Sequence, residues 1–308
     1  MLPARCSVPR LDAQVRTEAT VEAESADRNP RGPLFNSVRL SARKVAQWEL
    51  KLFFPQRTDG DMQQQLGLRN SKDRERFYAA FLGTLFLSLG GSLALAGSNL
   101  PEAVKTSSTL ILAAAPFAFV GAGLLVPGGL LGSLSAIYRL NPEYRRRQLC
   151  HEAGHFLVGY LVGIPVDTYS VGGAEVAVRF DEAGLRSGGG RATSAADRLD
   201  VLACVSMAGI AGEVIGCGDA EGGADDLAQL RGIMVASALR AKEQQDDRVR
   251  WATLMALTQL QRHGASFDAL VESFERGDDV PTCISAIERA AVDERHGTQP
   301  EAAATKSL

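Results

Sequence analysis

The sequence is short of the residues that mark several specialised classes of protein. Its five cysteines, at positions 6, 150, 204, 217 and 283, are odd in number and never spaced as C-x-x-C. This argues against a disulfide framework and favours a reducing compartment. The formal net charge of the 308 residues is −3, so the composition suggests no nucleic-acid partner. The phosphate-binding sequence G-x-x-x-x-G-K-[ST] does not occur, so these residues contain no P-loop ATPase.

Histidine is scarcer still, and its distribution is informative. Two of the four histidines fall within one pentapeptide, His151-Glu152-Ala153-Gly154-His155. Four residues advance a helix by slightly more than one turn, so both imidazoles would point from one face and could bind one metal ion. Glu152 would lie beside them, placed to take a proton from a metal-bound water. This arrangement is typical of a zinc peptidase in which the glutamate is the general base.

The flanking residues predict that a helix runs through this pentapeptide. Asn141 and Pro142 form a typical helix start, as N-cap and first helical residue, and Gly163 and Pro165 form a typical end. The residues that follow the pentapeptide are largely apolar. An apolar helix needs a reason to carry two imidazoles and a carboxylate in its middle, and a metal ion supplies one. The alternative is that the two histidines only make local hydrogen bonds.

Two long segments without charged residues precede this helix. The first runs from residue 77 to about residue 101 and the second from residue 106 to residue 138. Each exceeds the roughly 20 residues that a helix needs to cross a bilayer, so residues 76–139 are expected to form a transmembrane hairpin. The alternative is a pair of buried helices in a soluble protein. Because small residues let helices approach closely in lipid, five glycines are expected on the helix contact. They are Gly83, Gly90, Gly91, Gly121 and Gly123.

Basic residues flank the outer ends of this hairpin, whereas the loop between the two spans has one acid and one base. By the positive-inside tendency, both ends then face the cytoplasm-like side of the membrane. The pentapeptide follows the second span closely, so it is expected to work near the membrane surface.

Residues 1–75 form a polar N-terminal extension. The first ten residues contain arginine and serine but no acid, which resembles the start of an organelle transit peptide. The alternative is a disordered tail. Residues 38–54 have helical apolar spacing, and they are expected to lie either on the membrane surface or on the later domain.

Residues 140–295 are expected to form one mostly helical domain, followed by a tail at 296–308. Strands are predicted at 166–171 and 175–180. Ser194, with Asp197 three residues later, predicts a capped helix that continues through residue 216. Further helices are predicted at 225 to about 242, 247–263, 266–276 and 280–292. The predicted fold class is therefore mostly α, with a two-helix hairpin, an α-rich domain and a small β element.

A catalytic zinc site needs a third protein ligand besides the two histidines. Asp225 and Asp226 stand at a predicted helix start, where Asp225 is expected to be the N-cap and Asp226 is left free to reach a metal. Glu213 and Asp225 remain alternatives. Cys150 would project about 100° away from the neighbouring histidine on a helix, so we interpret it as a packing residue. The two other histidines lie in polar stretches near the chain end and are expected on the surface.

Three segments resemble the peptidase domain of the FtsH-type membrane zinc proteases. They are HEAGH at 151–155, MAGIAGEVIG at 207–216 and GGADDLAQL at 222–230, in the family's order and approximate spacing. The pentapeptide is identical to that of the family, and the other two segments match more loosely. The resemblance covers roughly residues 142–290. FtsH proteins have an ATPase domain between the spans and the protease, so this chain most resembles the plant and algal FtsH-like proteins that lack it.

The resemblance implies that His151, His155 and Asp226 bind Zn2+, that Glu152 is the general base, and that Glu213 supports the site. The implied function is a membrane-anchored zinc metalloendopeptidase that hydrolyses polypeptides without an ATPase of its own. The alternative is a proteolytically inactive scaffold that associates with ATPase-bearing FtsH subunits; a homo-oligomer is a further implied assembly. The implied location is a chloroplast membrane, thylakoid or envelope, with the mitochondrial inner membrane as the alternative.

Overall fold

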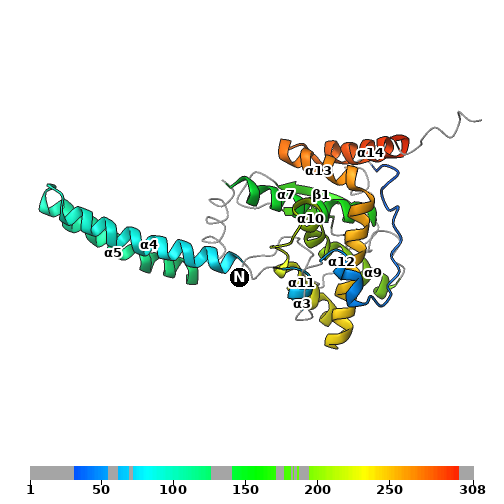
Figure 1. Cartoon of the computed structure of the whole chain (residues 1–308), viewed down its shortest axis with the longest axis horizontal. Helices are drawn as coiled ribbons and strands as arrows, with labels where there is room; N and C mark the ends of the chain where they lie inside the picture. The colour runs from blue at the N-terminus through cyan, green and yellow to red at the C-terminus, as the bar shows by residue number, and fades with distance from the viewer. Residues whose placement is uncertain are drawn as a thin grey trace, which may run out of the picture. The chain divides into compact units, whose positions relative to one another are not determined.

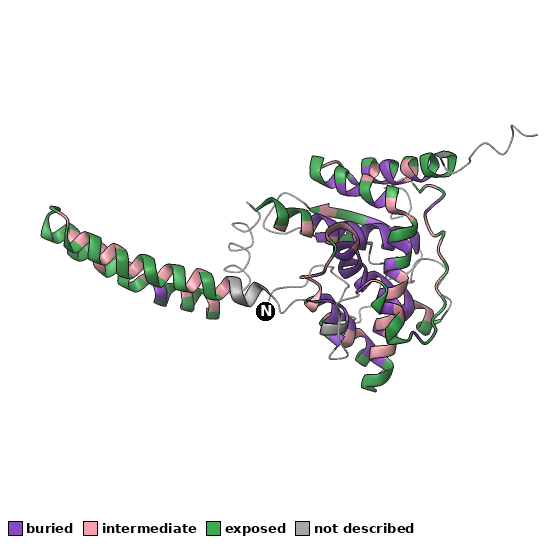
Figure 2. Cartoon of the chain, viewed as in Figure 1, coloured by how far each residue is buried: buried purple, intermediate pink, exposed green. Residues whose placement is uncertain are grey.

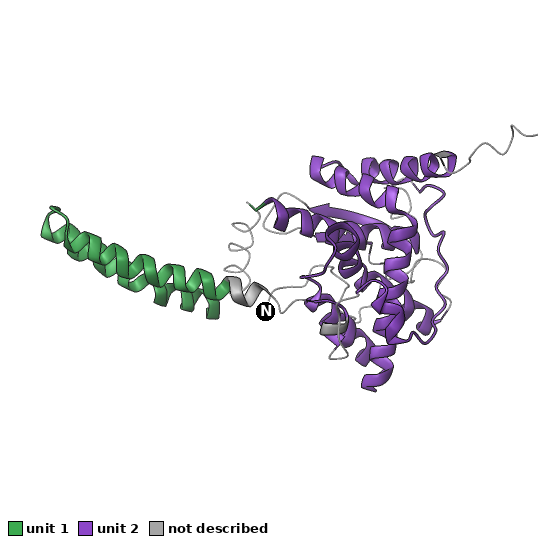
Figure 3. Ribbon diagram, in the orientation of Figure 1, with its two compact units in different colours: residues 1–3, 70–141 green, residues 4–69, 142–308 purple. Residues whose placement is uncertain are grey.

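The computed structural model describes residues 31–54, 62–68, 72–125, 141–170, 177–181, 183, 186 and 194–297. These residues are mostly helical, and they include one small two-stranded sheet, as the sequence predicts. The chain falls into two compact units (Figure 3). One holds the described residues between 70 and 141, and the other holds the remainder. The transit-like first residues and the end of the C-terminal tail lie outside the described residues.

The first unit is a pair of long helices, α4 (Lys72–Ala96) and α5 (Glu102–Leu125), which pack side by side (Figure 1). Both are long and apolar enough to cross a membrane, which is consistent with membrane association. Their apolar stretches are 0% and 6% buried, and Figure 2 shows both helices as exposed or intermediate along almost all of their described length. Most of their large hydrophobic residues are exposed. Residues 126–138, which the sequence assigns to the second span, lie outside the described residues.

The covered face of α4 carries small side chains at Ala80, Thr84, Ser88 and Gly91. It also carries Phe77 and Phe81, whose rings lie 5.2 and 6.0 Å from that of Phe119 on α5. A Cβ added at Gly91 would lie 3.0 Å from Cδ1 of Leu112 on α5, so this glycine lies on the helix contact as expected. The prediction is wrong for three other glycines, because a Cβ there would meet none of the described atoms within 4 Å. They are Gly83, Gly90 and Gly121. Composition indicates that such helices pack closely, but it does not say which face each glycine occupies.

The second unit is built around α7 (Pro142–Leu161), which begins and ends where the sequence predicts. Around α7 pack α10 (Ala208–Cys217), α12 (Lys242–Arg262) and α13 (Gly264–Arg276). The remaining helices are α9 (Ala195–Ser206), α11 (Ala224–Ala236) and α14 (Val280–Gly297). Strands β1 (Val166–Ser170) and β2 (Ala177–Phe180) form an antiparallel pair that packs against α7.

Helix boundaries differ from the prediction at several places. The helix predicted to begin at residue 247 begins at Lys242, and the one predicted to end at residue 292 ends at Gly297. The helix capped by Ser194 does not run on to residue 216, because it stops at Ser206 and restarts at Ala208 with Met207 at the junction. The helix predicted to reach residue 242 ends at Ala236, and α12 begins at Lys242. The Ser194 cap itself is confirmed: its Oγ accepts a hydrogen bond from the N–H of Asp197 at 3.1 Å.

A third segment, residues 195–217, also has the length and hydropathy of a membrane span. It comprises α9 and α10 and is 83% buried, whereas the hairpin helices are exposed. Its apolar composition therefore reflects the core of the second unit.

The described part of the N-terminal extension packs on the second unit instead of forming a separate region. It includes two short helices, α2 (Gln47–Lys51) and α3 (Met62–Gln65). Val45 and Leu50 are buried in the core, and Nε1 of Trp251 donates to the carbonyl of Ser41 at 3.1 Å. Of the two positions expected for residues 38–54, the structure thus shows the one on the later domain.

Candidate metal centre

The pentapeptide lies in the part of α7 that crosses the core. From Leu149 to Leu161, His151 is the one residue of α7 that is not buried. Glu152 is 7% exposed and His155 is fully buried. Burial of polar side chains in such a helix is costly unless each finds a partner. The positions of those partners define the site.

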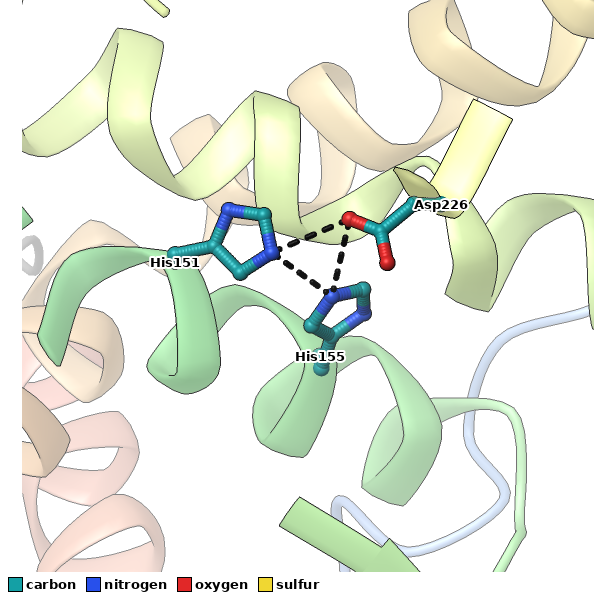
Figure 4. Close-up of side chains that lie close together, drawn as sticks. All are labelled: His151, His155 and Asp226. Atoms are coloured by element: carbon teal, nitrogen blue, oxygen red, sulfur yellow. Dashed lines mark hydrogen bonds and ion pairs between the residues drawn. The ribbon is translucent and has the colours of Figure 1, made fainter. Parts of the chain in front are cut away.

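Three potential ligand atoms converge on one point (Figure 4). Nε2 of His151 lies 3.2 Å from Nε2 of His155, and Oδ2 of Asp226 lies 3.0 Å from the first and 3.6 Å from the second. Asp226 comes from the first turn of α11 and is buried. The structure therefore brings together the three residues that the resemblance implies as ligands, and their ligand atoms all lie within 4.8 Å of one another.

The far side of each imidazole shows which nitrogen carries the proton. Nδ1 of His155 lies 2.8 Å from the carbonyl oxygen of Val205, which can only accept a hydrogen bond, so Nδ1 must be the donor. Nδ1 of His151 lies 2.8 Å from Oε1 of Glu213 and donates in the same way. Both Nε2 atoms of the neutral rings then present lone pairs to the carboxylate of Asp226. Three acceptors in contact without a donor require a cation among them.

Without a metal ion, a proton is the cation available. Burial lowers the pKa of His151, but the charge of Asp226 and hydrogen bonds to Asp226 and Glu213 outweigh burial and raise it to about 10. Burial raises the pKa of Asp226, yet the charges of His151 and His155 hold it well below its ordinary value. While both Nε2 atoms are unprotonated, Oδ2 of Asp226 has no hydrogen-bond donor among the described residues. It gains a donor only when one imidazole binds a proton at Nε2 as well as at Nδ1. A divalent cation would satisfy all three groups at once.

Two glycines shape the space beside the two imidazoles. A Cβ at Gly209 on α10 would lie 2.4 Å from Nε2 of His151 and 2.5 Å from Nε2 of His155. Gly223, the N-cap of α11, has φ +83°, which lets the chain turn so that Asp226 faces the histidines. The space beside the two imidazoles therefore exists because position 209 has no side chain. The open space beside Gly209 and the Asp226 oxygen without a hydrogen-bond donor both fit a bound metal ion.

The close approach of α7 and α10 also depends on glycine. A Cβ at Gly154 would lie 2.2 Å from the carbonyl oxygen of Ala208, and one at Gly212 would lie 2.2 Å from that of Cys150. The two backbones thus touch where these glycines face each other. The small residues of this segment therefore let α10 pack directly on the backbone of α7.

Glu213 connects the centre to an ion-pair network. Its carboxylate accepts from the backbone N–H groups of Glu221 and Gly222 at 2.8 and 3.1 Å, besides the imidazole of His151. Arg147, one turn before the pentapeptide, lies 3.4 Å from Glu213 and donates to the carbonyl and the carboxylate of Asp219. Although burial raises the pKa of Glu213, these donors lower it overall, so the carboxylate stays ionised and fixes the imidazole.

Glu152 points to a different partner. Its Oε2 accepts a hydrogen bond of 2.8 Å from the N–H of Val178 on β2. Burial raises the pKa of Glu152, and the charges of His155 and His151 and the N–H of Val178 offset this only in part. The carboxylate is therefore held next to Val178 of β2 and close enough to His151 and His155 to be influenced by their charge.

The other candidates lie elsewhere. Cys150 is buried and packs beneath Gly216 of α10, as a packing residue should. Asp225 is exposed and is not the N-cap, so that prediction is wrong: Gly223 occupies the cap position because the turn requires a positive φ. His296 is exposed as expected, whereas His263 is half-buried between α12 and α13.

Three features of the centre were not predicted from the sequence. They are the open space at Gly209, the hydrogen bond of His155 to the carbonyl of Val205, and the contact of Arg147 with Glu213. The glycine pair in Met207–Gly212 was visible as a packing signal, but the contact of Gly209 with two imidazoles depends on the crossing of α7 and α10. The carbonyl of Val205 is available because α9 stops one residue later.

Comparisons of the chain with protein-family models, with curated proteins and with solved structures each find no match. The chemistry of the centre must therefore be inferred from its own residues.

Proposed function

We propose that the protein is a membrane-anchored zinc metalloendopeptidase. One observation supports this most directly: two imidazole nitrogens and a carboxylate oxygen lie within 4.8 Å of one another, and Glu152 stands next to the first histidine on the same helix. A purely structural pair of histidines would not need a buried carboxylate facing both rings.

The donor set favours zinc. Two imidazoles and one carboxylate, with a fourth position left open, are typical of catalytic zinc sites, whereas magnesium and calcium prefer oxygen ligands. His151, His155 and Asp226 would hold the ion, and when bound it supplies Lewis-acid activation of water and of a peptide carbonyl. Glu213 and the carbonyl of Val205 orient the two imidazoles through their Nδ1 atoms.

Glu152 is the proposed general base. Its carboxylate would accept the proton of the attacking water and pass it to the nitrogen of the leaving amine. Because the N–H of Val178 holds only Oε2, the second carboxylate oxygen is free of that bond and can exchange the proton. The helix places this group next to His151, and the contact with β2 keeps it in one orientation.

The proposed substrate is an extended polypeptide. Among the described residues, β2 pairs with β1 alone, and its N–H at Val178 faces Glu152. Because Glu152 already occupies the N–H of Val178, a substrate strand would pair with the other main-chain groups of β2 and run close to the catalytic glutamate. Main-chain hydrogen bonds of this kind do not depend on a particular substrate side chain. This mode suits substrates that are already unfolded.

The hairpin of α4 and α5 would anchor the enzyme in a bilayer. We further propose that the chain is related to the FtsH-like proteins, that it resides in a plastid membrane, and that an ATPase-bearing subunit can deliver substrates to it. The order of the HEAGH, glycine-rich and Asp226 segments supports the relationship, and the structure assembles the same three segments into one centre.

The test combines metal analysis with a protease assay. The full chain, purified in detergent, should contain about one zinc per chain and cleave unfolded casein in a reaction that a chelator stops and zinc restores. The variant Glu152→Gln should retain zinc and lose cleavage. Zinc-dependent cleavage that survives this change would exclude the proposed mechanism, and a zinc-loaded chain without any cleavage would favour the scaffold.

A further inference from the structure

The outer face of α2 is apolar and has no cover among the described residues. Trp48 is 65% exposed and Leu52, the residue that ends the helix, is 73% exposed. The two are four residues apart and so lie on the same side of the helix. Large apolar side chains exposed as neighbours, on a helix whose other side is buried, often mark a contact surface.

This face is rigidly attached to the second unit. Leu50 and Phe54 are buried beneath it, and Nε of Arg250 donates to the carbonyl of Val45 at 3.3 Å. At the helix start, the N–H of Ala46 donates to Oε1 of Glu49 at 2.9 Å. The exposed pair is thus presented by fixed backbone, and its exposure does not arise from a loose end.

The segment that carries the pair is basic, while Asp247 of the neighbouring α12 is paired with Arg250. Residues 31–54 contain five basic residues and one acid, although acids outnumber bases in the whole chain. The single acid, Glu49, is bound to Arg43. Arg39, Lys44 and Lys51 are also exposed. An apolar centre surrounded by lysine and arginine complements a bilayer surface that contains anionic lipids, because tryptophan and leucine enter the headgroup boundary while cations pair with phosphates.

We propose that Trp48 and Leu52, with the basic residues Arg39 and Lys44 of the same segment, dock the second unit onto an anionic bilayer surface. The segment is close in sequence to the apolar hairpin, because α2 ends at Lys51 and α4 begins at Lys72. Both ends of a two-span hairpin emerge on one side of the membrane, so the second unit is joined twice to the same leaflet. The docked face would fix how the unit is oriented on that leaflet.

The chain contains two tryptophans, and this makes the proposal measurable. Trp251 is 1% exposed and serves as an internal reference. The full chain is reconstituted in vesicles of phosphatidylcholine with equimolar phosphatidylglycerol, with and without brominated acyl chains. The difference between wild type and Trp48→Phe isolates the emission of Trp48. Brominated lipid should reduce this emission about twofold, as expected for a ring in the headgroup boundary.

The charge requirement is tested with two matched variants. Arg39→Glu with Lys44→Glu should reduce the quenching of Trp48 to the level found in vesicles of phosphatidylcholine alone, and high salt should do the same in wild type. Arg240→Glu with Lys242→Glu changes two exposed basic residues elsewhere on the unit and should leave the quenching unchanged.

Two results would overturn the proposal. One is that brominated lipid leaves the emission of Trp48 unchanged in anionic vesicles. The other is emission that depends on the ratio of protein to lipid and not on lipid charge, which would assign the face to contact with another protein chain.

Discussion

Oε1 of Glu213 lies 2.8 Å from Nδ1 of His151, on the side of the ring opposite the nitrogen that faces Asp226. One buried carboxylate thereby sets both the orientation and the tautomer of the first histidine. Glu213 is itself held by two backbone N–H groups and by Arg147, so the orientation is determined by three elements of the fold.

Replacing Glu213 with glutamine should weaken zinc binding. The neutral amide is a poorer acceptor for Nδ1–H of His151, and its NH2 group conflicts with the N–H donors of Glu221 and Gly222. We expect the zinc affinity to fall about 10- to 100-fold, as when a supporting partner of a metal-binding histidine is lost. Competition with a chromophoric chelator measures this. Glu275→Gln, at an exposed carboxylate, is the control; equal affinities in the two variants would contradict the role of Glu213.

Replacing Glu152 with glutamine should separate binding from catalysis. The amide oxygen can still accept the hydrogen bond from Val178, so the local structure should be kept. Zinc content should be unchanged, while casein cleavage should fall by at least about 100-fold because no base remains to accept the proton. A rate near that of wild type would show that another group is the base.

Asp226 and Asp225 are a matched pair for identifying the third ligand. Asp226→Asn should reduce zinc affinity by at least about 100-fold, because it removes the charge that faces both imidazoles. Asp225→Asn, in the same helical turn but exposed, should change affinity little. Metal titration followed by calorimetry distinguishes them. A larger loss at position 225 would mean that a different carboxylate binds the ion.

Gly209→Ala should block the centre sterically. The new Cβ would fall within 2.5 Å of Nε2 of both histidines, so the rings would have to move and metal content should drop. Gly232→Ala is the control, because its Cβ meets no described atom within 4 Å and alanine in a helix is favoured by about 1 kcal/mol over glycine. Full zinc occupancy in the Gly209 variant would refute the proposed position of the ion.

His263 should contribute to loss of stability in acid. Burial, followed by the nearby charge of Arg262, lowers its pKa below the ordinary value of about 6.5. The unfolded chain then binds the proton more readily, so stability declines as the pH falls through the ordinary pKa and stops declining below the folded pKa. His263→Gln should reduce the drop in Tm between about pH 7 and pH 5, whereas His296→Gln, at an exposed site, should not. Identical drops in both variants would argue against it.

Local signals in the sequence were sufficient for part of this structure. The ends of α7, the Ser194 cap and the proximity of two histidines four residues apart follow from helix geometry and end signals. No comparable signal predicts the break at Met207. The break matters because the carbonyl of Val205 contacts His155, and these two residues are 50 positions apart in the sequence. Asp225 was mistaken for a cap because aspartate favours that position, whereas the chain needs the positive φ of Gly223. The docking of residues 31–54 likewise depends on side chains of α12 that lie far along the chain.

The contact of Gly154 with Gly212 has a consequence for how the centre would bind the proposed ion. Side chains between two helices can change rotamer, but backbones in direct contact cannot slide without breaking that contact. The positions from which both histidines and Glu213 extend are thus set by main-chain geometry before any ligand arrives. Less conformational entropy remains to be lost on binding, so more of the interaction energy is expressed as affinity.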